Sequence, residues 1–372
     1  MPSAADNIAW VESLSPWPEE FGLERMRRLL AELGNPQNAF PAIHVVGTNG
    51  KTTTARMTAA LLAAEGKTVG SYTSPHVTDW HERVQVNGEP ADLDGALARI
   101  RPASEALGAT QFEALTAAAL AEFAAAGADV AVVEAGLGGR LDATNVLRAP
   151  VVVLTNVDLE HTDVLGSTRE RIAREKLAVI QPGATAVLGE PEWEGMARTS
   201  GADAVVVTGL SNLALAVAAA ESFLGAPVDP AAAEKTSVPG RLEQRGESPL
   251  EIWDGAHNLG GVGYVLARLP TRSYVVVASI LADKDVDGML AALSALGRVL
   301  VATQSTNSRA LPADELASRA ESFFAETETV REPAAALGRA RELAGPDGAV
   351  FVTGSLYLLA DLATVRPQAP VP

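Results

Sequence analysis

The chain of 372 residues contains no cysteine. Disulfide bonds, catalysis by a thiol and zinc sites built from cysteine are therefore excluded. The absence is compatible with a reducing compartment, and we expect a cytoplasmic protein. The first ten residues, MPSAADNIAW, have no basic segment followed by an apolar one, so no secretory signal is expected there.

Positive charge and long apolar runs are also scarce. Lys and Arg number 29 against 46 Asp and Glu, which gives a formal net charge of −17. So acidic a surface repels polynucleotides and anionic lipid, and we expect neither nucleic acid nor a membrane as a partner. The apolar runs near 114–137 and 213–224 are broken by Glu122, Asp129 and Glu221, so no membrane span is expected. An anionic substrate must be held by local backbone N–H groups, a few basic side chains and metal ions.

Apolar residues, in contrast, make up 47% of the chain, which is enough for packed cores, and the length suggests two or three domains. Residues 236–249, TSVPGRLEQRGESP, interrupt the pattern with Pro, Gly and charge. We place a boundary at the start of this stretch, between domains 1–236 and 237–372. The last eight residues, VRPQAPVP, are expected to fray.

Short β-branched runs alternate with Ala-rich helical runs throughout both domains. This βα alternation predicts an α/β protein with mostly parallel sheets and helices on both faces. Strands are expected at 42–47, 68–74, 129–134, 150–156, 184–189 and 203–209, and then at 250–254, 274–280, 298–304 and 348–354. Helices are expected at 52–64, 112–126, 168–180 and 211–224, from about 258, near 286–296, up to about 343, and after the last strand.

The stretch HVVGTNGKTTT, 44–54, is close to a phosphate-binding loop but misses the strict pattern G-x-x-x-x-G-K-[ST]. The residues at 50–52 supply its end, whereas the early glycine would fall on Val45. Gly47 comes two residues late. The stretch is therefore either a nucleotide site of another kind or a glycine turn with a surface lysine.

The context of this loop favours the nucleotide site. The loop leaves an apolar strand and opens a helix, where backbone N–H groups and the helix dipole favour phosphate. Lys51 is positioned to meet the β- and γ-phosphates, and Thr52 to face Mg²⁺.

Two common nucleotide-binding classes are disfavoured. A small GTPase needs N-K-x-D, and the nearest stretch, TNVD at 155–158, lacks the lysine. A dinucleotide fold needs G-x-G-x-x-G, and after Gly136 and Gly138 the third position is Leu141.

Polar side chains follow several of the predicted strands, at the edge where open α/β sheets bind ligands. Glu134 is a natural Mg²⁺ ligand there, or else an ordinary solvated loop residue. Ser74, in TSPH, either ligates Mg²⁺ or belongs to a turn. The loop at 154–166 is either a metal cluster or a loop with a satisfied histidine. Its candidate ligands are Asp158, Glu160, His161 and Asp163.

The remaining candidates are weak when each is taken alone. Lys176 lies on an amphipathic helix among charged neighbours, and its spacing alone favours a solvated face. In the second domain, Arg241 of VPGR is a candidate for binding a phosphate from across a cleft. Asp254 and His257, in WDGAHN, follow a strand at the ligand edge.

Together these motifs form an ordered series that resembles the Mur ligase family, and within it the folylpolyglutamate synthase/dihydrofolate synthase branch. The resemblance covers nearly the whole chain, and the string E-x-G-L-G-G-R-L-D-A-T-N is its most specific part. It implies a phosphate-loop domain of the Mur ligase central type with a mostly parallel sheet, and a smaller Rossmann-like C-terminal glutamate-ligase domain. The motifs are G-T-N-G-K-T-T, S-P-H, E-x-G-L-G-G-R-L-D-A-T-N, D-x-x-H-T-D, R-E-K, V-P-G-R and D-G-A-H-N.

The resemblance also implies roles for single residues. ATP would meet Gly47, Thr48, Asn49, Gly50, Lys51, Thr52, Asn212, Arg241 and Asp254. Two Mg²⁺ ions would be held by Thr52, Ser74, Glu134, His161 and Lys176. A pterin-bearing substrate would lie against Glu20, Phe21, Gly22, Thr110, Gln111, Phe112, Glu113, Leu141, Asp142 and Ala143. The catalytic set would be Lys51, Lys176, Arg241 and His257.

The implied role of Lys176 reverses the interpretation from spacing. The family carries a carbamylated lysine at this position, and a carbamate turns an ammonium into an anion that can hold the second Mg²⁺. The implied reaction forms an acyl phosphate from a folate-type carboxylate and ATP, and the amine of L-glutamate then displaces phosphate. Closure of the two domains would assemble the site. We expect a monomer whose partners are ATP, L-glutamate and a folate or pteroate.

Two alternatives stay open. The chain has Glu20-Phe21-Gly22 where the family often has Asp-Leu-Gly, so the acceptor could be a non-folate carboxylate. A nucleotide-binding protein without catalysis is the other alternative, and the retained second-metal residues His161 and Lys176 speak against it.

Overall fold

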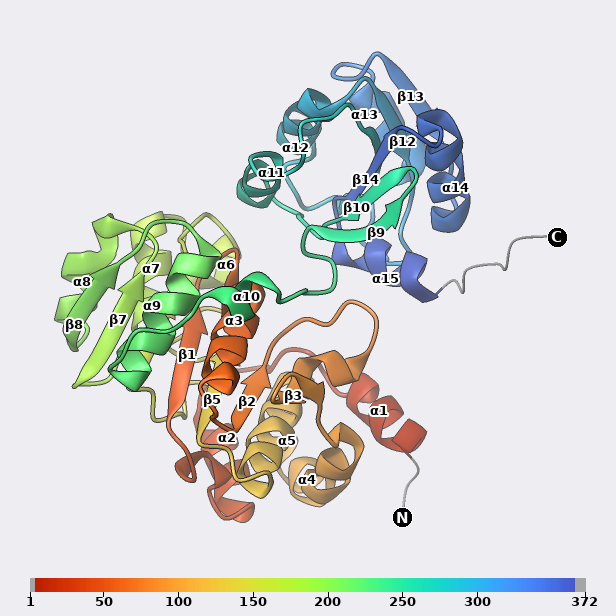
Figure 1. The fold of residues 1–372 in the computed structure, drawn as a ribbon. Helices are drawn as coiled ribbons and strands as arrows, with labels where there is room; N and C mark the ends of the chain where they lie inside the picture. Colours follow the sequence, from red (N-terminus) through yellow and green to blue (C-terminus); the bar gives the residue numbers. More distant parts are fainter. Residues whose placement is uncertain (1–3, 365–372) are drawn as a thin grey trace. The chain divides into compact units, whose positions relative to one another are not determined.

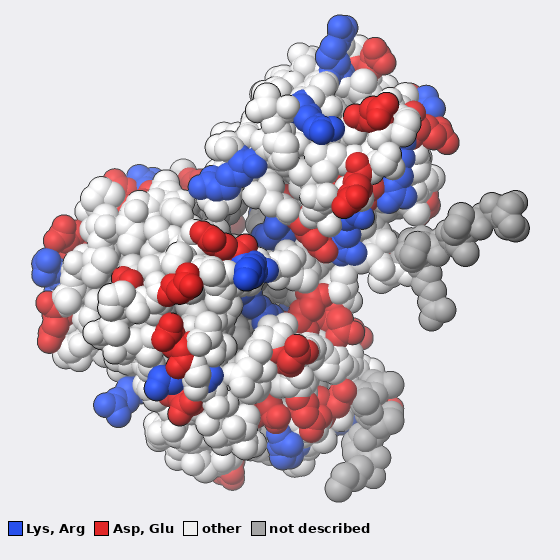
Figure 2. Space-filling view, viewed as in Figure 1, with Lys and Arg blue, Asp and Glu red and all other residues white. Residues whose placement is uncertain are grey.

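The computed structural model describes residues 4–364, and the chain divides into two compact units, Met1–Thr236 and Ser237–Pro372. The tail expected to fray lies outside the described residues. No helix within 4–364 is both long and apolar enough to cross a bilayer. On the described surface that Figure 2 shows, acidic and basic side chains are interspersed.

The first unit is built on an eight-stranded sheet with the order β4-β3-β2-β5-β1-β6-β7-β8. The strands from β2 to β8 in this order run parallel, and β3 and β4 form an antiparallel extension of one edge. The strands are β1 (Ala42–Val46), β2 (Val69–Tyr72), β3 (Val84–Val86), β4 (Glu89–Pro90), β5 (Val130–Glu134), β6 (Val151–Leu154), β7 (Ala184–Leu188) and β8 (Ala202–Val207).

Helices cover both faces of this sheet, as the alternation predicted. One face packs against α3 (Lys51–Ala64), α9 (Asn212–Leu224) and α10 (Ala231–Glu234), which lie side by side in Figure 1. The other face packs against two helix groups in separate apolar clusters. These are α1 (Ala4–Ser13), α2 (Glu24–Glu32), α4 (Leu93–Leu107) and α5 (Gln111–Ala125), and then α7 (Arg169–Leu177) and α8 (Glu194–Thr199). A short helix, α6 (Thr162–Leu165), precedes α7.

The second unit carries a six-stranded sheet with the order β13-β12-β11-β14-β10-β9, in which only β9 is antiparallel. Its strands are β9 (Glu243–Glu247), β10 (Leu250–Trp253), β11 (Val275–Ala278), β12 (Val299–Ala302), β13 (Glu326–Thr329) and β14 (Ala349–Thr353). Its helices are α11 (Leu259–Leu266), α12 (Val286–Leu293), α13 (Ala313–Ala320), α14 (Pro333–Ala344) and α15 (Leu356–Thr364). The fold class is confirmed: both units are α/β with mostly parallel sheets.

The edge strands β9 and β13 and the helix α4 were missed by the sequence patterns, for different physical reasons. The edge strands β9 (EQRGE) and β13 (ETET) are charged, and natural sheets place charge on edge strands to prevent further pairing. Helix α4 contains Gly95 and Pro102, two residues that usually end a helix, yet Asp92 caps it by accepting the Gly95 N–H at 2.9 Å.

The register of the central strands brings their carboxyl ends to one edge. Val45 of β1 pairs with Glu134 of β5, Val46 with Leu154 of β6, and Tyr72 of β2 aligns with Val133 of β5. The residues that directly follow β1, β2 and β6 therefore collect beside Glu134, at the edge where open α/β sheets bind ligands.

Gly70 of β2 sets how closely helix α5 approaches this part of the sheet. A Cβ at Gly70 would lie 2.4 Å from the ring of Phe123, which is fully buried. We expect Gly70→Ala to lower the free energy of unfolding by roughly 1–3 kcal/mol, because the extra methyl overpacks this contact. Chemical denaturation of the variant and the parent chain measures this loss of unfolding free energy.

Gly195→Ala is the matched control, since a Cβ at this position in α8 meets nothing within 4 Å. The double variant Gly70→Ala/Phe123→Val should lose less stability than the sum of the two single variants. A Gly70→Ala protein as stable as the parent chain would refute the close packing of β2 against α5.

Candidate active site

The loop at 47–50 joins β1 to α3 and needs glycine at both ends. Gly47 has φ +148°, and a Cβ there would lie 1.8 Å from Thr155 Oγ1. Gly50 has φ +82°, and its Cβ would lie 2.5 Å from Asn212 Oδ1. Both the backbone conformation and the space exclude a side chain. Val45, where the strict pattern wants glycine, is a fully buried residue of β1, so the turn begins two residues later.

This phosphate loop is clamped by the segment 155–158, which follows β6. Asn156 accepts two backbone hydrogen bonds from the loop. The Thr48 N–H donates to the Asn156 carbonyl at 2.9 Å, and the Asn49 N–H donates to the Asn156 side-chain Oδ1 at 2.8 Å. Thr155 Oγ1 donates to the Asn49 carbonyl at 2.7 Å, and the Asp158 N–H donates to Thr48 Oγ1 at 3.0 Å. Sequence reasoning missed this role, because it tested the segment only as a base-reading motif and as metal ligands.

A second group of side chains holds the clamp in turn. Glu190 Oε2 accepts the Val157 N–H at 2.8 Å, and Arg169 Nε donates to the Val157 carbonyl at 2.9 Å. Arg169 Nη2 also donates to Glu190 Oε1 at 2.7 Å, and the Trp193 indole donates to Glu190 Oε2 at 2.9 Å. The segment at 155–158 is thereby fixed from both sides.

The start of α3 is suited to a phosphate group. The first N–H groups of a helix, here those of Lys51, Thr52 and Thr53, have no acceptor within the helix. They and the positive end of the helix dipole favour an anion at this point. The Lys51 ammonium lies on the same loop and donates to the Thr48 carbonyl at 3.1 Å.

Thr52, in the first turn of α3, and Ser74, in the loop after β2, both bond Glu134 at the end of β5. Thr52 Oγ1 lies 2.9 and 3.1 Å from the two Glu134 carboxylate oxygens, and the Ser74 N–H donates to Glu134 Oε2 at 3.0 Å. Glu134 is 2% exposed. Hydroxyl and carboxylate oxygens are the ligands that Mg²⁺ prefers, so this donor set fits the predicted ion.

Arg56, one helical turn beyond Thr52, lies next to this group and was not singled out from the sequence. Its Nη2 donates to Thr73 Oγ1 at 3.0 Å and also to the Glu82 carbonyl. Burial lowers the pKa of Arg56 to about 10, while the Glu134 and Glu82 carboxylates act in the opposite direction. The guanidinium ties α3 to the loop that carries Ser74.

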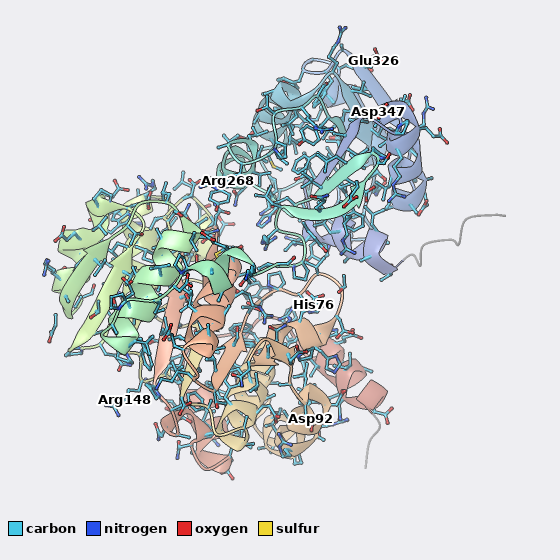
Figure 3. The ribbon with its side chains drawn as sticks, in the orientation of Figure 1. His76, Asp92, Arg148, Arg268, Glu326 and Asp347 are labelled. Atoms are coloured by element: carbon cyan, nitrogen blue, oxygen red, sulfur yellow. The ribbon has the colours of Figure 1, made fainter. Side chains whose placement is uncertain are left out.

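His76 lies further along that loop (Figure 3). Its ring lies 4.4 Å from the ring of Trp80, and Arg83 Nε donates to His76 Nδ1 at 2.9 Å. Burial and the neighbouring Arg83 lower the pKa of His76 to about 4, so its imidazole is neutral at pH 7.

Lys176 is buried, so the solvated face that its spacing favoured is wrong. The residue is 1% exposed, and Nζ donates to the Gly47 carbonyl at 2.8 Å and to Glu160 Oε1 at 2.6 Å. The helix is amphipathic as expected, but Lys176 lies on its inner face beside the phosphate loop. Burial lowers the pKa of Lys176 to about 8, although the Glu160 carboxylate opposes this shift. A larger share of uncharged amine is therefore available than in an exposed lysine.

The neighbouring acidic loop does not form a cluster of its own. Within residues 4–364, no group of three or more His, Asp or Glu side chains is arranged to hold a metal ion. His161 is exposed, has φ +45°, and its carbonyl accepts the Val164 and Leu165 N–H groups of α6. The mixed set of hydroxyl, carboxylate, imidazole and lysine that the resemblance implied stays a prediction.

Thr110 and Glu113, predicted to bind substrate, form the cap of α5. Thr110 and Glu113 bond to each other reciprocally, and Glu113 Oε2 also accepts from Arg25 Nε at 2.7 Å. Gln111 donates its N–H to the Ser15 carbonyl. The ring of Phe112 lies against Gly136, where a Cβ would meet it at 2.5 Å. Whether these residues contact a substrate stays a prediction.

The other predicted substrate residues divide into exposed and buried ones. Phe21 and Leu141 are 43% and 46% exposed, and Glu20 and Gly22 are exposed beside Phe21. Asp142 and Ala143 are buried. Phe21 and Leu141 offer exposed apolar surface, whereas Asp142 and Ala143 are buried parts of the loop after β5.

The predicted nucleotide residues lie in both units. Asn212, at the start of α9, is buried against Gly50. In the second unit, Asp254 follows β10 and accepts the N–H groups of Leu242 and Ala256, both at 2.8 Å. Burial raises the pKa of Asp254, and the charge of Arg241 opposes the shift. His257 Nδ1 lies 2.9 Å from the Gly255 carbonyl.

Known proteins resemble this chain in sequence and in fold. The Mur ligase middle domain matches residues 45–224, and the Mur ligase glutamate ligase domain matches residues 240–356. A dihydrofolate synthase/folylpolyglutamate synthase of Mycobacterium tuberculosis is 35% identical, over 83% of this chain and 80% of the relative.

Two solved structures are similar over almost their whole length. FolC of Escherichia coli, in complex with DHPP and ADP, has a TM-score of 0.88 and 31% identity, and the match covers 98% of this chain and 99% of that chain. A bifunctional folylpolyglutamate synthase/dihydrofolate synthase of Yersinia pestis, complexed with AMPPNP and a Mn ion, has a TM-score of 0.87 and 30% identity. Its match covers 98% of this chain and 99% of that chain.

The clamp on the phosphate loop can be tested without any ligand. Asn156→Leu removes the side-chain acceptor of the Asn49 N–H, and we expect the amide hydrogen exchange of Asn49 to become about tenfold faster. Asn156→Asp keeps an acceptor oxygen and should keep the protection. The Thr48 N–H, which bonds the Asn156 main chain, is the internal reference. Unchanged exchange at Asn49 in the leucine variant contradicts the clamp.

Proposed function

We propose roles for the residues of this site from the premise that the chain belongs to the Mur ligase family, as a folylpolyglutamate synthase/dihydrofolate synthase. It is accordingly an ATP-dependent ligase that joins glutamate to folate substrates. The observation that carries the assignment of roles is that the phosphate loop, Glu134 and the buried Lys176 meet at one edge of the sheet.

The nucleotide-binding role falls to the phosphate loop, residues 47–52. Relatives bind ADP, and one binds AMPPNP with a Mn ion. In this chain the loop and the first N–H groups of α3 would hold the β- and γ-phosphates, with the Lys51 ammonium neutralising their charge. Asn212 borders the loop at Gly50, which supports a nucleotide contact.

Two divalent-ion sites complete the first unit. Thr52, Ser74 and Glu134 would hold one Mg²⁺, and Glu134, His161 and a carbamylated Lys176 the second. Bound Mg²⁺ supplies charge neutralisation on the phosphates and aligns the reacting oxygens. The support is the oxygen donor set around Glu134 and the burial of Lys176 against the Gly47 carbonyl of the phosphate loop.

Carbamylation requires an uncharged lysine, because only the free amine adds to CO₂. The amine nitrogen bonds the carbon of CO₂, and one proton leaves to solvent. Burial of Lys176 lowers its pKa to about 8, which supports this chemistry. Glu160, which is paired with the ammonium, would have to release it.

The proposed reaction has two transfers. A carboxylate oxygen of the acceptor attacks the γ-phosphorus of ATP, the bond to ADP breaks, and an acyl phosphate forms. The amine of L-glutamate then attacks the acyl carbon, phosphate leaves, and the amine proton goes to solvent or to a base. Positioning and charge stabilisation supply most of such catalysis, so Lys51 and the start of α3 carry much of the first transfer.

The remaining assignments follow the family order of domains. We assign ATP binding to residues 1–236 and the glutamate-ligase domain to residues 237–372, with Arg241, Asp254 and His257 acting toward ATP. The acceptor would lie against 20–22, 110–113 and 141–143. We propose that the protein acts as a monomer in the cytoplasm, with ATP, L-glutamate and a folate or pteroate as substrates.

The acceptor is the first point to test. We expect the purified protein to release ADP from ATP, Mg²⁺ and L-glutamate only when dihydropteroate or tetrahydrofolate is added, with a product heavier by one glutamyl residue. Coupled ADP detection and mass spectrometry measure this. Omission of glutamate is the control. No stimulation by either pterin would leave the ligase chemistry but reject the folate-type acceptor for this chain.

The role of Lys176 is the second point to test. We expect Lys176→Ala to lower kcat roughly a hundredfold or more, because it removes a charged group next to the transferred phosphate. Added bicarbonate should restore part of the activity, and Lys176→Glu, which places a carboxylate nearby, should retain more than Lys176→Met. Near-normal turnover of Lys176→Ala without bicarbonate rules out a carbamate role. ¹³C NMR of protein equilibrated with ¹³C-bicarbonate should detect a carbamate signal that Lys176→Met lacks.

A further inference from the structure

His44 is a polar side chain in the middle of the otherwise apolar strand β1. It shares a sheet face with Ala42 and Val46, which belong to two different apolar clusters, and it is 1% exposed. Burial lowers its pKa to about 4, so the imidazole is neutral at pH 7. A buried polar group is costly unless it is hydrogen-bonded, so the partner of His44 is informative.

That partner is Thr144, in the loop after β5. His44 Nε2 lies 2.8 Å from Thr144 Oγ1, and Thr144 Oγ1 in turn donates to Asp142 Oδ1. A threonine hydroxyl has a single hydrogen, which here goes to the carboxylate, so it accepts from the imidazole. His44 is therefore the tautomer with its proton on Nε2.

The chain of bonds ends on a carboxylate that holds the loop together. Asp142 Oδ1 also accepts the Thr144 N–H at 3.0 Å, and Asp142 Oδ2 accepts the Leu137 N–H at 2.7 Å. The carboxylate thus joins the two ends of the loop at 137–144, which contains no helix or strand. The loop is fixed to β1 through Thr144 and His44.

We propose that His44 and Thr144 are positioning residues for the acceptor: they fix the loop at 137–144, and with it Leu141 and Asp142, before the acceptor binds. The inference rests on the proposed function, in which this loop contacts the pterin-bearing substrate. Leu141 is 46% exposed, so its position depends on the hydrogen bonds of the loop rather than on packing. These are the bonds around Asp142 and the bond from the Arg140 N–H to the Glu175 carbonyl at 3.0 Å. Neither His44 nor Thr144 has to touch substrate for this role.

The kinetic consequence is selective. Loss of the Thr144 hydroxyl should loosen the acceptor loop and leave the phosphate loop, which is clamped from 155–158, in place. We expect Thr144→Val, which keeps the shape of the side chain, to raise KM for the pterin acceptor about tenfold with little change in kcat or in KM for ATP. Thr144→Ser, which keeps the hydroxyl, should restore KM for the acceptor.

Thr58→Val is the matched control. Thr58 is equally buried, but its hydroxyl donates only to the Thr54 carbonyl of its own helix at 2.8 Å. This variant removes a buried hydroxyl of the same kind and should leave KM for the acceptor unchanged. A comparable rise of that KM in Thr58→Val would show a general loss of stability and overturn the positioning role.

The outcomes separate the inference from its premise. Absence of pterin-dependent turnover in the parent protein rejects the proposed acceptor, and the inference falls with it. Normal turnover of the parent together with an unchanged acceptor KM in Thr144→Val rejects the inference alone.

A second measurement on the unmodified protein covers the case in which Thr144→Val does not fold. ¹⁵N NMR of the His44 imidazole at pH 7 should show a neutral ring with its proton on Nε2. A proton on Nδ1, or a charged ring, would overturn the bond chain.

Discussion

The site depends on the clamp between the phosphate loop and the segment after β6. Gly47 and Gly50 give the loop its conformation, but glycine is also the residue that loses most entropy when it is fixed. Asn156 and Thr155 hold the loop with three hydrogen bonds of 2.7–2.9 Å. Lys176, in α7, donates a further hydrogen bond to the Gly47 carbonyl. The clamp makes the loop ready for phosphate before ATP binds, so less ordering is needed on binding.

The sheet topology explains why so many costly groups collect at this edge. Strand β1 lies between β5 and β6, so the residues that follow β1 bond residues at the ends of both neighbours. Thr52 bonds Glu134, 82 positions away, and Asn49 bonds Thr155, 106 positions away. Glu134 and Lys176 are almost fully buried, and burial of an ionised group is unfavourable unless it is paired. Lys176 is paired with the Glu160 carboxylate, and Glu134 accepts hydrogen bonds from Thr52 and Ser74. Stability alone would favour apolar residues at these positions, which is why we interpret them as functional.

Much of the fold and of the candidate site could be predicted from the sequence. The features that could not be predicted have physical reasons for escaping it. The βα alternation predicted the parallel sheets, because strands buried on both faces are continuous apolar runs. The edge strands β9 and β13 carry charge and gave no such signal. The phosphate loop and Glu134 were found because they follow strands directly. The spacing of Lys176 did not reveal its burial, because most residues of its helix are polar. Its burial is explained only by the three-dimensional position of the loop at 47–50, which lies against it. The clamp by Asn156 and the bond of His44 to Thr144 join residues about 100 positions apart, and one sequence holds no information on such pairs.

The pairing of Lys176 links the state of the phosphate loop to the metal ions. In this structure its ammonium bonds the Gly47 carbonyl and balances Glu160. The carbamate assigned to this lysine under the proposed function is an anion, so it would repel Glu160 and lose the bond that its ammonium makes to Gly47. A nearby positive charge would offset that change. The Lys51 ammonium acts on both Lys176 and Glu160, and the metal ion that Glu134 and His161 are proposed to hold would add to it. Because linkage is reciprocal, metal binding would favour the carbamate by the same free energy with which the carbamate favours the metal. Metal binding would then change the hydrogen bond that Lys176 makes to the phosphate loop. The affinity for the nucleotide would in this way depend on whether the metal ion is bound.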